Sequence, residues 1–300
     1  MAWRDQLNGD SLEWLLEPDD PGVRYLALRD LLDRPPHDPE LRAAQAKAHA
    51  QGPIAATLDG MNEAGYWVEP GPGYNPKYRS TIWAIILLAQ LGASARLDGR
   101  VAQGCAYLLD HSLAAGGQFT ITGAPSGTVD CLQGNLCAAL LDLGYDDPRL
   151  EAAFDWMART VTGEGIAPAE ERRAAVRYYA GKCGPGFACG ANNKLACAWG
   201  AVKVMLAFGK LPPQRRTPLI ERAIAQGAAF LLGTDPARAE YPTGYSDKPS
   251  GNWWKFGFPV FYVTDLLQNV EALVGLSYQD DPRLADALAL IRAKQDAQGR

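Results

Sequence analysis

Residues 102–109 read AQGCAYLL, and residues 225–232 repeat this segment as AQGAAFLL, with six of eight positions identical. A second repeat, DPRL, occurs at 147–150 and again at 281–284, each time after an apolar segment. Recurrence of short segments along a chain is typical of proteins that stack similar supersecondary units. We therefore expect a series of helical hairpins.

The Asp-Pro pair of the second repeat predicts the start of a helix, since aspartate can cap the first turn and the proline ring fixes the first helical φ. The segment before a joint is apolar nearly all round, as in 82–89, and the segment after it is amphipathic, as in 284–294. The sequence predicts an all-α fold, an α/α toroid of about five hairpins with inner and outer helix rings, and residues 1–300 as one domain. Related joints occur at 38–41, 97–100 and 217–220.

Composition places the chain among ordinary globular proteins, because 47% of its residues are hydrophobic and 21% are charged. The 34 acidic and 29 basic residues give a net charge of -5, which argues against nucleic acid as a partner. The longest apolar run, 82–89, is far too short to span a membrane, and no leader-like segment is recognised. We expect a cytoplasmic protein without a transmembrane segment.

Long loops rich in glycine and proline are expected to connect each outer helix to the next inner one, all at one mouth of the ring. The run WWKFGFP at 253–259 concentrates aromatic residues on such a loop, which favours a hydrophobic pocket or its lid, with core packing as the alternative. The predicted partner is a hydrophobic or lipid-like small molecule. The predicted substrate-binding residues are Trp67, Arg79, Asn135, Trp253, Trp254, Phe256 and Phe258.

The last residues, 288–300, read LALIRAKQDAQGR and carry the sharpest family resemblance. They are similar to the repeat of squalene-hopene cyclases, in which a helix is followed by Gln, three residues, Gly, one residue and Trp. Weaker copies occur at 58–67 and 108–119. The chain thus resembles the terpenoid cyclase and protein prenyltransferase superfamily of α/α toroids, as a divergent cysteine-containing member. The resemblance implies the toroid fold and an isoprenoid or other apolar substrate.

Several family features are missing. The stretch 193–199 is similar to the surroundings of the zinc-ligating cysteine in protein prenyltransferase β subunits, but Leu195 stands where that family has an aspartate, and no histidine matches. The Asp-x-Asp-Asp acid motif of squalene cyclases does not occur. The chain also stops where the repeat would place its tryptophan, which implies a domain truncated at its C-terminal end or lacking its last inner helix.

Five of the six cysteines fall within 67 residues. Cys131 and Cys197 are expected near the starts of neighbouring inner helices, where the helix dipole favours thiolate. The glycine-rich loop carrying Cys183 and Cys189 could bring two further sulfurs to the same point. Four thiolates suit zinc or an iron–sulfur cluster, so these four are the predicted metal ligands. Space filling by buried thiols and disulfide pairing, such as Cys183 with Cys189, remain alternatives.

The predicted catalytic residues are Asp130, Lys194 and Asp265. Asp130 could equally be the cap of its helix. Asp265 could form a structural ion pair with Arg79 or belong to a site. Lys203 lies on an otherwise apolar helix, and we expect its side chain to extend along the surface so that the ammonium group reaches water. Two cysteines, Cys105 and Cys137, are expected to be core residues.

Three hypotheses follow for function. The first is a prenyltransferase-like or cyclase-like enzyme that binds an apolar molecule beside a cysteine-ligated metal, with the three catalytic candidates moving protons. The second is a toroid that binds a peptide, lipid or cofactor without catalysis. The third is an electron-transfer or sensor module with an iron–sulfur cluster.

Overall fold

The computed structural model describes residues 3–168, 170–174, 178 and 182–300. This part of the chain is helical, and it contains no β-strand, only isolated bridges such as the one between Ala188 and Ala196. None of its helices is both long and apolar enough to cross a membrane. The helices are α1 (Leu12–Leu15), α2 (Pro21–Leu26), α3 (Pro39–Ala50), α4 (Pro53–Asp59), α5 (Thr81–Gln90), α6 (Gly99–Ser112), α7 (Asp130–Asp142), α8 (Arg149–Thr162), α9 (Ala198–Lys210), α10 (Pro218–Leu231), α11 (Leu266–Gly275) and α12 (Ala285–Arg292).

The helix starts follow the predicted joints. At four of the five, an aspartate carboxylate accepts a hydrogen bond from the backbone N–H two residues later, at 2.9 to 3.0 Å. At the fifth, the Thr217 hydroxyl oxygen accepts from the backbone N–H of Ile220 at 3.3 Å. These hydrogen bonds satisfy N–H groups that have no partner inside the helix. The local chemistry read from the repeats therefore positions the helices. The four aspartates are Asp38, Asp98, Asp147 and Asp281.

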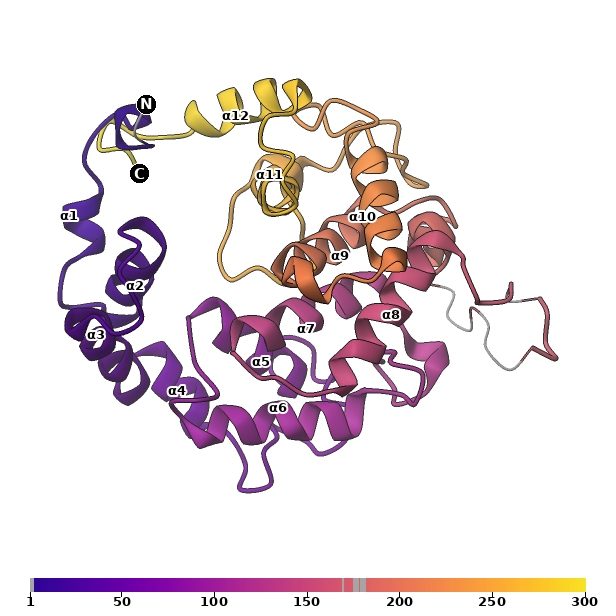
Figure 1. The fold of residues 1–300 in the computed structure, drawn as a ribbon, viewed down its shortest axis with the longest axis horizontal. Helices are drawn as coiled ribbons and strands as arrows, with labels where there is room; N and C mark the ends of the chain where they lie inside the picture. The colour runs from indigo at the N-terminus through magenta and orange to yellow at the C-terminus, as the bar shows by residue number, and fades with distance from the viewer. Residues whose placement is uncertain (1–2, 169, 175–177, 179–181) are drawn as a thin grey trace.

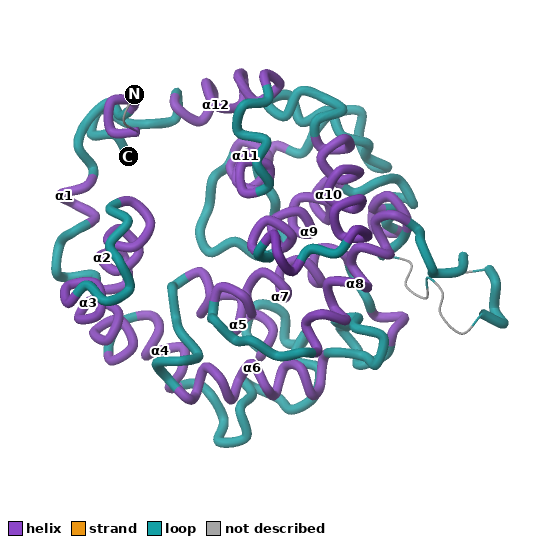
Figure 2. Tube along the Cα trace, viewed as in Figure 1, coloured by secondary structure: helices purple, strands orange, loops and turns teal. Residues whose placement is uncertain are grey.

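The most apolar helices occupy the centre of the molecule. α5, α7, α9 and α11 pack against one another in sequence order, while α6, α8, α10 and α12 lie around them (Figures 1 and 2). Eight of the ten residues of α5 are buried, whereas α8 and α10 bury one face only. The hydrophobic effect explains this division, because exposing any face of an all-apolar helix to water is unfavourable.

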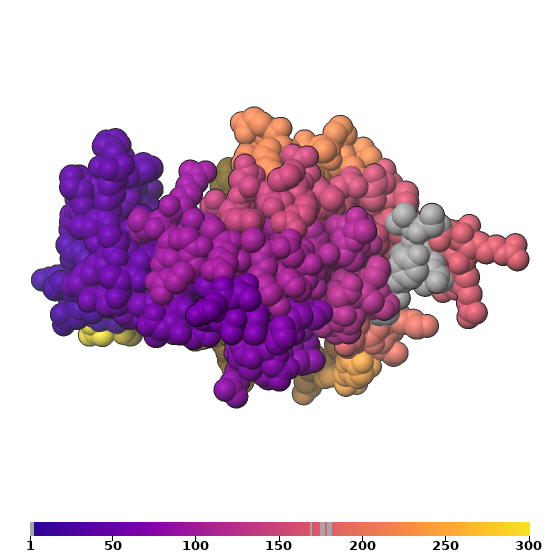
Figure 3. Space-filling view, turned by 90° about the horizontal axis from the view of Figure 1, so that it is seen from below, coloured from indigo at the N-terminus to yellow at the C-terminus, as the bar shows by residue number. Residues whose placement is uncertain are grey.

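The chain path curves round until its two ends meet (Figure 1). The backbone N–H of Asn8 donates to the side-chain oxygen of Gln295 at 3.0 Å, and the Gln295 amide donates to the carbonyl of Gln6 at 3.2 Å. Seen from the side, the molecule is flattened, with the N-terminal helices at one end and the C-terminal segment beneath them (Figure 3). The two hydrogen bonds of Gln295 fasten the segment that follows α12 to residues 6–8.

The closest helix contact lies between α7 and α9. A Cβ atom placed on Gly134 would lie 2.3 Å from the backbone carbon of Lys203, so only glycine permits this approach. The two helix starts consequently lie side by side, and they bring the residues that precede α9 next to the first turn of α7.

Candidate functional site

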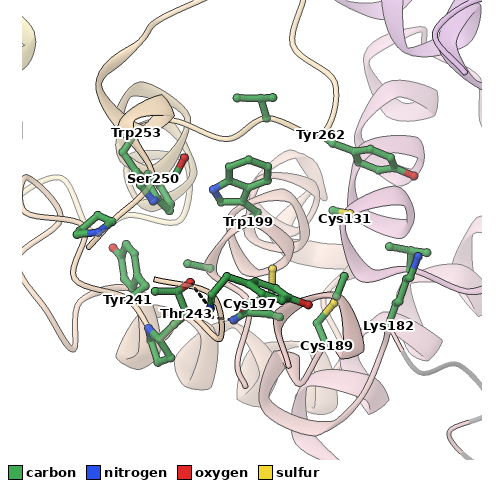
Figure 4. Close-up of a pocket in the computed structure, with 18 of the residues that line it drawn as sticks. Cys131, Lys182, Cys189, Cys197, Trp199, Tyr241, Thr243, Ser250, Trp253 and Tyr262 are labelled. Atoms are coloured by element: carbon green, nitrogen blue, oxygen red, sulfur yellow. Dashed lines mark hydrogen bonds between the residues drawn. The ribbon is translucent and has the colours of Figure 1, made fainter. Parts of the chain in front are cut away.

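A cavity of about 530 Å³ opens beside the starts of α7 and α9. Loops before α5, α9 and α11 form its other walls, as the sequence predicts for the mouth (Figure 4). Two lysines, Lys77 and Lys182, line it, whereas none of the lining residues described is an aspartate or glutamate. The cavity is therefore largely apolar with a positive edge. Its aromatic lining residues are Tyr74, Tyr78, Trp199, Tyr241, Tyr245, Trp253 and Tyr262.

Hydrogen bonds fix part of this aromatic wall. The Tyr241 hydroxyl donates to the carbonyl of Leu231 at 2.8 Å and accepts from the Asn269 amide at 2.8 Å. The ring of Trp253 packs against Tyr241, with ring centroids 5.2 Å apart. The satisfied hydroxyl lets the Tyr241 ring stay buried at low cost, and Trp253 packs on that ring, so this part of the wall is largely pre-formed.

Three of the predicted cysteines line the cavity: Cys131, Cys189 and Cys197 (Figure 4). Cys131 lies in the first turn of α7, and Cys197 is the N-cap residue of α9. Cys189 is positioned by a short antiparallel contact, in which its N–H donates to the carbonyl of Leu195 at 3.1 Å. The N–H of Cys197 donates to the carbonyl of Phe187 at 2.9 Å in the same contact. The loop thus folds back to place two cysteines together.

Cys189 and Cys197 are neighbouring, electrostatically coupled thiols. Interaction with the Cys197 thiol lowers the pKa of Cys189 to about 6 against the opposing effect of burial, with further help from the backbone N–H groups of Ala191 and Asn192 and the charge of Lys182. The pKa of Cys197 is raised by the same interaction and by burial. Cys189 is therefore a thiolate near neutral pH, and Cys197 keeps its proton.

Cys183 forms a hydrogen bond with Asp130 rather than with another cysteine. Its thiol donates to Oδ1 of Asp130 at 2.8 Å, and both side chains are buried. Burial raises the pKa of Asp130 to about 7, while the second carboxylate oxygen, Oδ2, has no hydrogen-bond partner. Asp130 is the first residue of α7 rather than its cap, because Val129 occupies the cap position.

The predicted four-cysteine metal site does not fit this arrangement. A zinc or iron–sulfur site requires its sulfur ligands around one centre. Here Cys183 is directed to Asp130, and Cys189 is paired with Cys197. Within the described residues, no group of three or more His, Cys, Asp or Glu side chains could hold a metal ion. All six cysteines are free thiols, so the structure contains no disulfide between Cys183 and Cys189.

The predicted aromatic residues have different positions. Trp253 lines the mouth cavity. Trp67 is a core residue whose indole N–H donates to the carbonyl of residue 57 at 2.7 Å, and the Trp254 indole donates to the carbonyl of residue 237 at 2.9 Å. Phe256 packs on the core under the Lys294 ammonium. Phe258 is 65% exposed and lines a second, central cavity.

The predicted polar residues lie outside the mouth cavity. Arg79 is exposed, and it forms no ion pair with Asp265 within the described part of the chain. Asp265 is buried and caps α11 by accepting from the Gln268 backbone N–H at 2.9 Å. Asn135 donates to a loop carbonyl at 3.0 Å and faces the central cavity, one turn beyond Cys131.

Both lysines named from the sequence differ from expectation. Lys194 is exposed in the turn before α9, and it does not line the mouth cavity. Lys203 was expected to reach water, and this prediction is wrong, because its side chain is only 2% exposed. Since α9 is enclosed by α7, α10 and α11, the Lys203 stem has no surface to follow. The predicted core positions of Cys105 and Cys137 are confirmed.

Sequence reasoning missed the tyrosines of the mouth cavity. Tyr74 and Tyr78 flank a short turn before α5, and Tyr241 and Tyr245 flank another after α10. Both turns belong to the loops expected at the mouth, so the repeated Tyr-x₃-Tyr spacing was a usable signal.

Comparison with known proteins adds no assignment. The chain matches no family model, no curated protein and no solved structure.

Proposed function

We propose that this chain is a prenyltransferase-like or terpene-cyclase-like enzyme that binds an isoprenoid or other apolar substrate in the mouth cavity. The observation that carries the proposal is the position of the Cys189–Cys197 pair on the wall of a cavity lined by large aromatic side chains. A nucleophile and a hydrophobic binding surface in one cavity are the parts that a transferase acting on an apolar electrophile needs.

The α/α toroid is part of this proposal. Its support is the alternation of apolar central helices with amphipathic peripheral ones, and the hydrogen bonds that join the two ends of the chain. The resemblance of residues 288–300 to the cyclase repeat points the same way. The cytoplasm as location and membership of the terpenoid cyclase superfamily are proposed on the same resemblance and composition.

The lining suits an apolar molecule with an anionic end. Aromatic side chains supply most of the surface, and burying apolar area contributes about 25 cal/mol per Å² to binding. Lys77 and Lys182 place positive charge at the edge. The faces of Tyr78 and Tyr262 already hold the Lys77 ammonium at 4.9 and 5.0 Å, so these rings can also stabilise positive charge on a substrate carbon.

The thiol pair supplies the chemistry. The Cys189 thiolate sulfur forms a bond to an electrophilic carbon of the substrate, and the anionic leaving group departs with the bonding electron pair toward the lysines. The Cys197 proton stays on Cys197 throughout, so this step needs no external base. Asp130, Lys194 and Asp265 are not assigned to it, because none of them lines the mouth cavity.

Alkylation with iodoacetamide tests the proposal directly. We expect Cys189 to react fastest, with a rate that rises around pH 6, and Cys105 and Cys183 to stay unmodified as internal controls. Farnesol and farnesyl diphosphate should slow the reaction at Cys189, the diphosphate more strongly. Reaction at Cys189 no faster than at Cys183, or no protection by either isoprenoid, would contradict the proposal.

The cavity alone also supports a binding protein without catalysis. A specific outcome separates the two functions. If farnesyl diphosphate protects Cys189 but neither forms a covalent adduct nor releases diphosphate on prolonged incubation, the chain binds isoprenoids without transferring them.

A further inference from the structure

A second cavity of about 650 Å³ lies at the centre of the molecule, among residues of α2, α5, α7, α9 and α11. It differs from the mouth cavity in its charges. Three cationic side chains and three acidic ones line it: Arg29, Lys203, Lys210, Asp30, Asp142 and Glu271.

Lys203 is the exception among the cations of this central cavity. Arg29 pairs with Asp30 at 2.6 Å, and Lys210 pairs with Asp142 at 2.9 Å. The Lys203 ammonium nitrogen instead donates to the neutral side-chain oxygen of Gln268, and no carboxylate of the described residues lies within ion-pair distance of it. Lys203 is thus a buried amine without a counter-ion.

The surroundings of Lys203 favour the uncharged amine. Burial lowers the pKa of Lys203 to about 8, against the opposing influence of Cys131, Asp265 and Glu271, which face it from α7 and α11. A lysine in ordinary solvent is almost fully protonated at pH 7 and is not a nucleophile. An uncharged fraction beside a cavity is the condition under which lysine attacks carbonyl carbons.

We propose that Lys203 is a nucleophilic amine that forms an imine with an aldehyde or ketone bound in the central cavity. The amine nitrogen bonds to the carbonyl carbon, and the carbonyl oxygen takes up a proton to give a carbinolamine. Loss of one water molecule then leaves a carbon–nitrogen double bond. The amine and the carbonyl compound thus yield one imine and one water, with no oxidant or reductant.

The charges of the cavity select a neutral carbonyl compound over an anion. When Lys203 is uncharged, the two other cations that line the cavity, Arg29 and Lys210, are each paired with an aspartate, so the described lining offers an anionic ligand no unpaired cation. Apolar side chains, including Ile86, Ala138 and Leu206, line the same cavity and suit a short hydrocarbon chain. Gln268 can accept a hydrogen bond from the carbinolamine nitrogen from the place where it now accepts from Lys203.

Reductive trapping tests this inference on the intact protein. The protein is incubated at pH 7 with hexanal and sodium cyanoborohydride, which reduces the imine to a stable secondary amine, and modified lysines are identified by peptide mass mapping. We expect the hexyl group on Lys203 at a rate about tenfold above that at Lys210, which is ion-paired in the same cavity.

Three variants make the outcome decisive. Lys203→Arg keeps a cation but should lose the fast labelling, while Lys210→Arg should retain it at Lys203. Cys189→Ser should leave the labelling unchanged, so failure of the mouth-cavity proposal and failure of this one are distinguishable. Equal labelling of Lys203 and Lys210 in the unaltered protein, or labelling confined to exposed lysines, overturns the proposal without any variant having to fold.

Discussion

The Cys183 thiol donates to Oδ1 of Asp130 at 2.8 Å, and this hydrogen bond joins the loop before α9 to the first turn of α7. It holds the sulfur of Cys183 away from the Cys189–Cys197 pair and leaves the mouth cavity with three cysteines instead of four. The Asp130 carboxyl that accepts this hydrogen bond is buried, so its ionisation is unfavourable.

Ionisation of Asp130 should weaken the fold as pH rises. The pKa of Asp130 is raised in the folded state to about 7, from 3.8, so the unfolded state releases its proton first. The contribution of the protonated Asp130 carboxyl to the free energy of unfolding is complete below pH 4. It falls by about 1.4 kcal/mol per pH unit between pH 4 and pH 7, and it is lost once the pH has risen through 7. Urea unfolding between pH 5 and 8 measures this. Relative to the wild type, Asp130→Asn should gain stability over that interval, and parallel curves for the two proteins would refute the prediction.

Removing the Cys197 thiol should make Cys189 less reactive at neutral pH. Interaction with the Cys197 thiol is the largest cause of the lowered pKa of Cys189. In Cys197→Ala the rate of iodoacetamide alkylation should therefore rise at a pH higher by about one pH unit. Lys182→Gln is the matched control, because that charge is the smallest of the causes, and its profile should move less. An unchanged profile in Cys197→Ala would mean that the pair does not act as described.

Truncating Trp253 should reduce isoprenoid binding. Trp253 is buried in the cavity wall, and loss of its indole removes about 1.4 kcal/mol or more of contact energy, which is about tenfold in affinity. Calorimetric titration of Trp253→Ala with farnesol measures the loss of affinity. Phe258→Ala, which alters an aromatic residue of the same run outside the mouth cavity, should bind as the wild type does. Equal losses in both variants would count against the mouth cavity as the binding site.

A methyl group on Gly134 should destabilise the protein. The added Cβ would lie 2.3 Å from the Lys203 backbone carbon, which forces α7 and α9 apart. We expect Gly134→Ala to lower the free energy of unfolding by about 3 kcal/mol, since overpacking against backbone outweighs the helix propensity of alanine. Gly257→Ala is the control, because nothing lies within 4 Å of its added Cβ. Chemical denaturation of both variants checks the difference.

The helix joints could be predicted from the sequence because their chemistry is local. An aspartate that caps a helix needs only the next few residues, and Asp147 and Asp281 each accept from the backbone N–H two residues later, as the DPRL repeats predict. Asp147 lies one residue before the N-cap of α8, and Asp281 caps the short 3-10 turn that leads into α12. The apolar character of 82–89 likewise fixes the burial of α5 without knowledge of its neighbours. The all-helical class follows from these short-range signals.

The site could be predicted only in part because it depends on how loops fold over long distances. The sequence identified the cysteines and the mouth, but not that Cys183 would meet Asp130 and Cys189 would meet Cys197, since the loop path decides those partners. Lys203 was misplaced for a similar reason. Whether a lysine side chain reaches water depends on which helices enclose it. The 3.6-residue helical period gives only the face on which the residue lies, not the neighbours of that face.

Residues of helix α7 line both the mouth cavity and the central cavity. Cys131 faces the mouth cavity from this helix, and Asn135 faces the central cavity one turn later. Burial raises the pKa of Cys131 to about 12, and the positive charge of Lys203 opposes that rise. Any ligand that cancels the positive charge of Lys203 must therefore make the Cys131 thiolate harder to form. By thermodynamic reciprocity, ionising Cys131 must favour the charged amine, so what occupies one cavity sets the proton balance of the other.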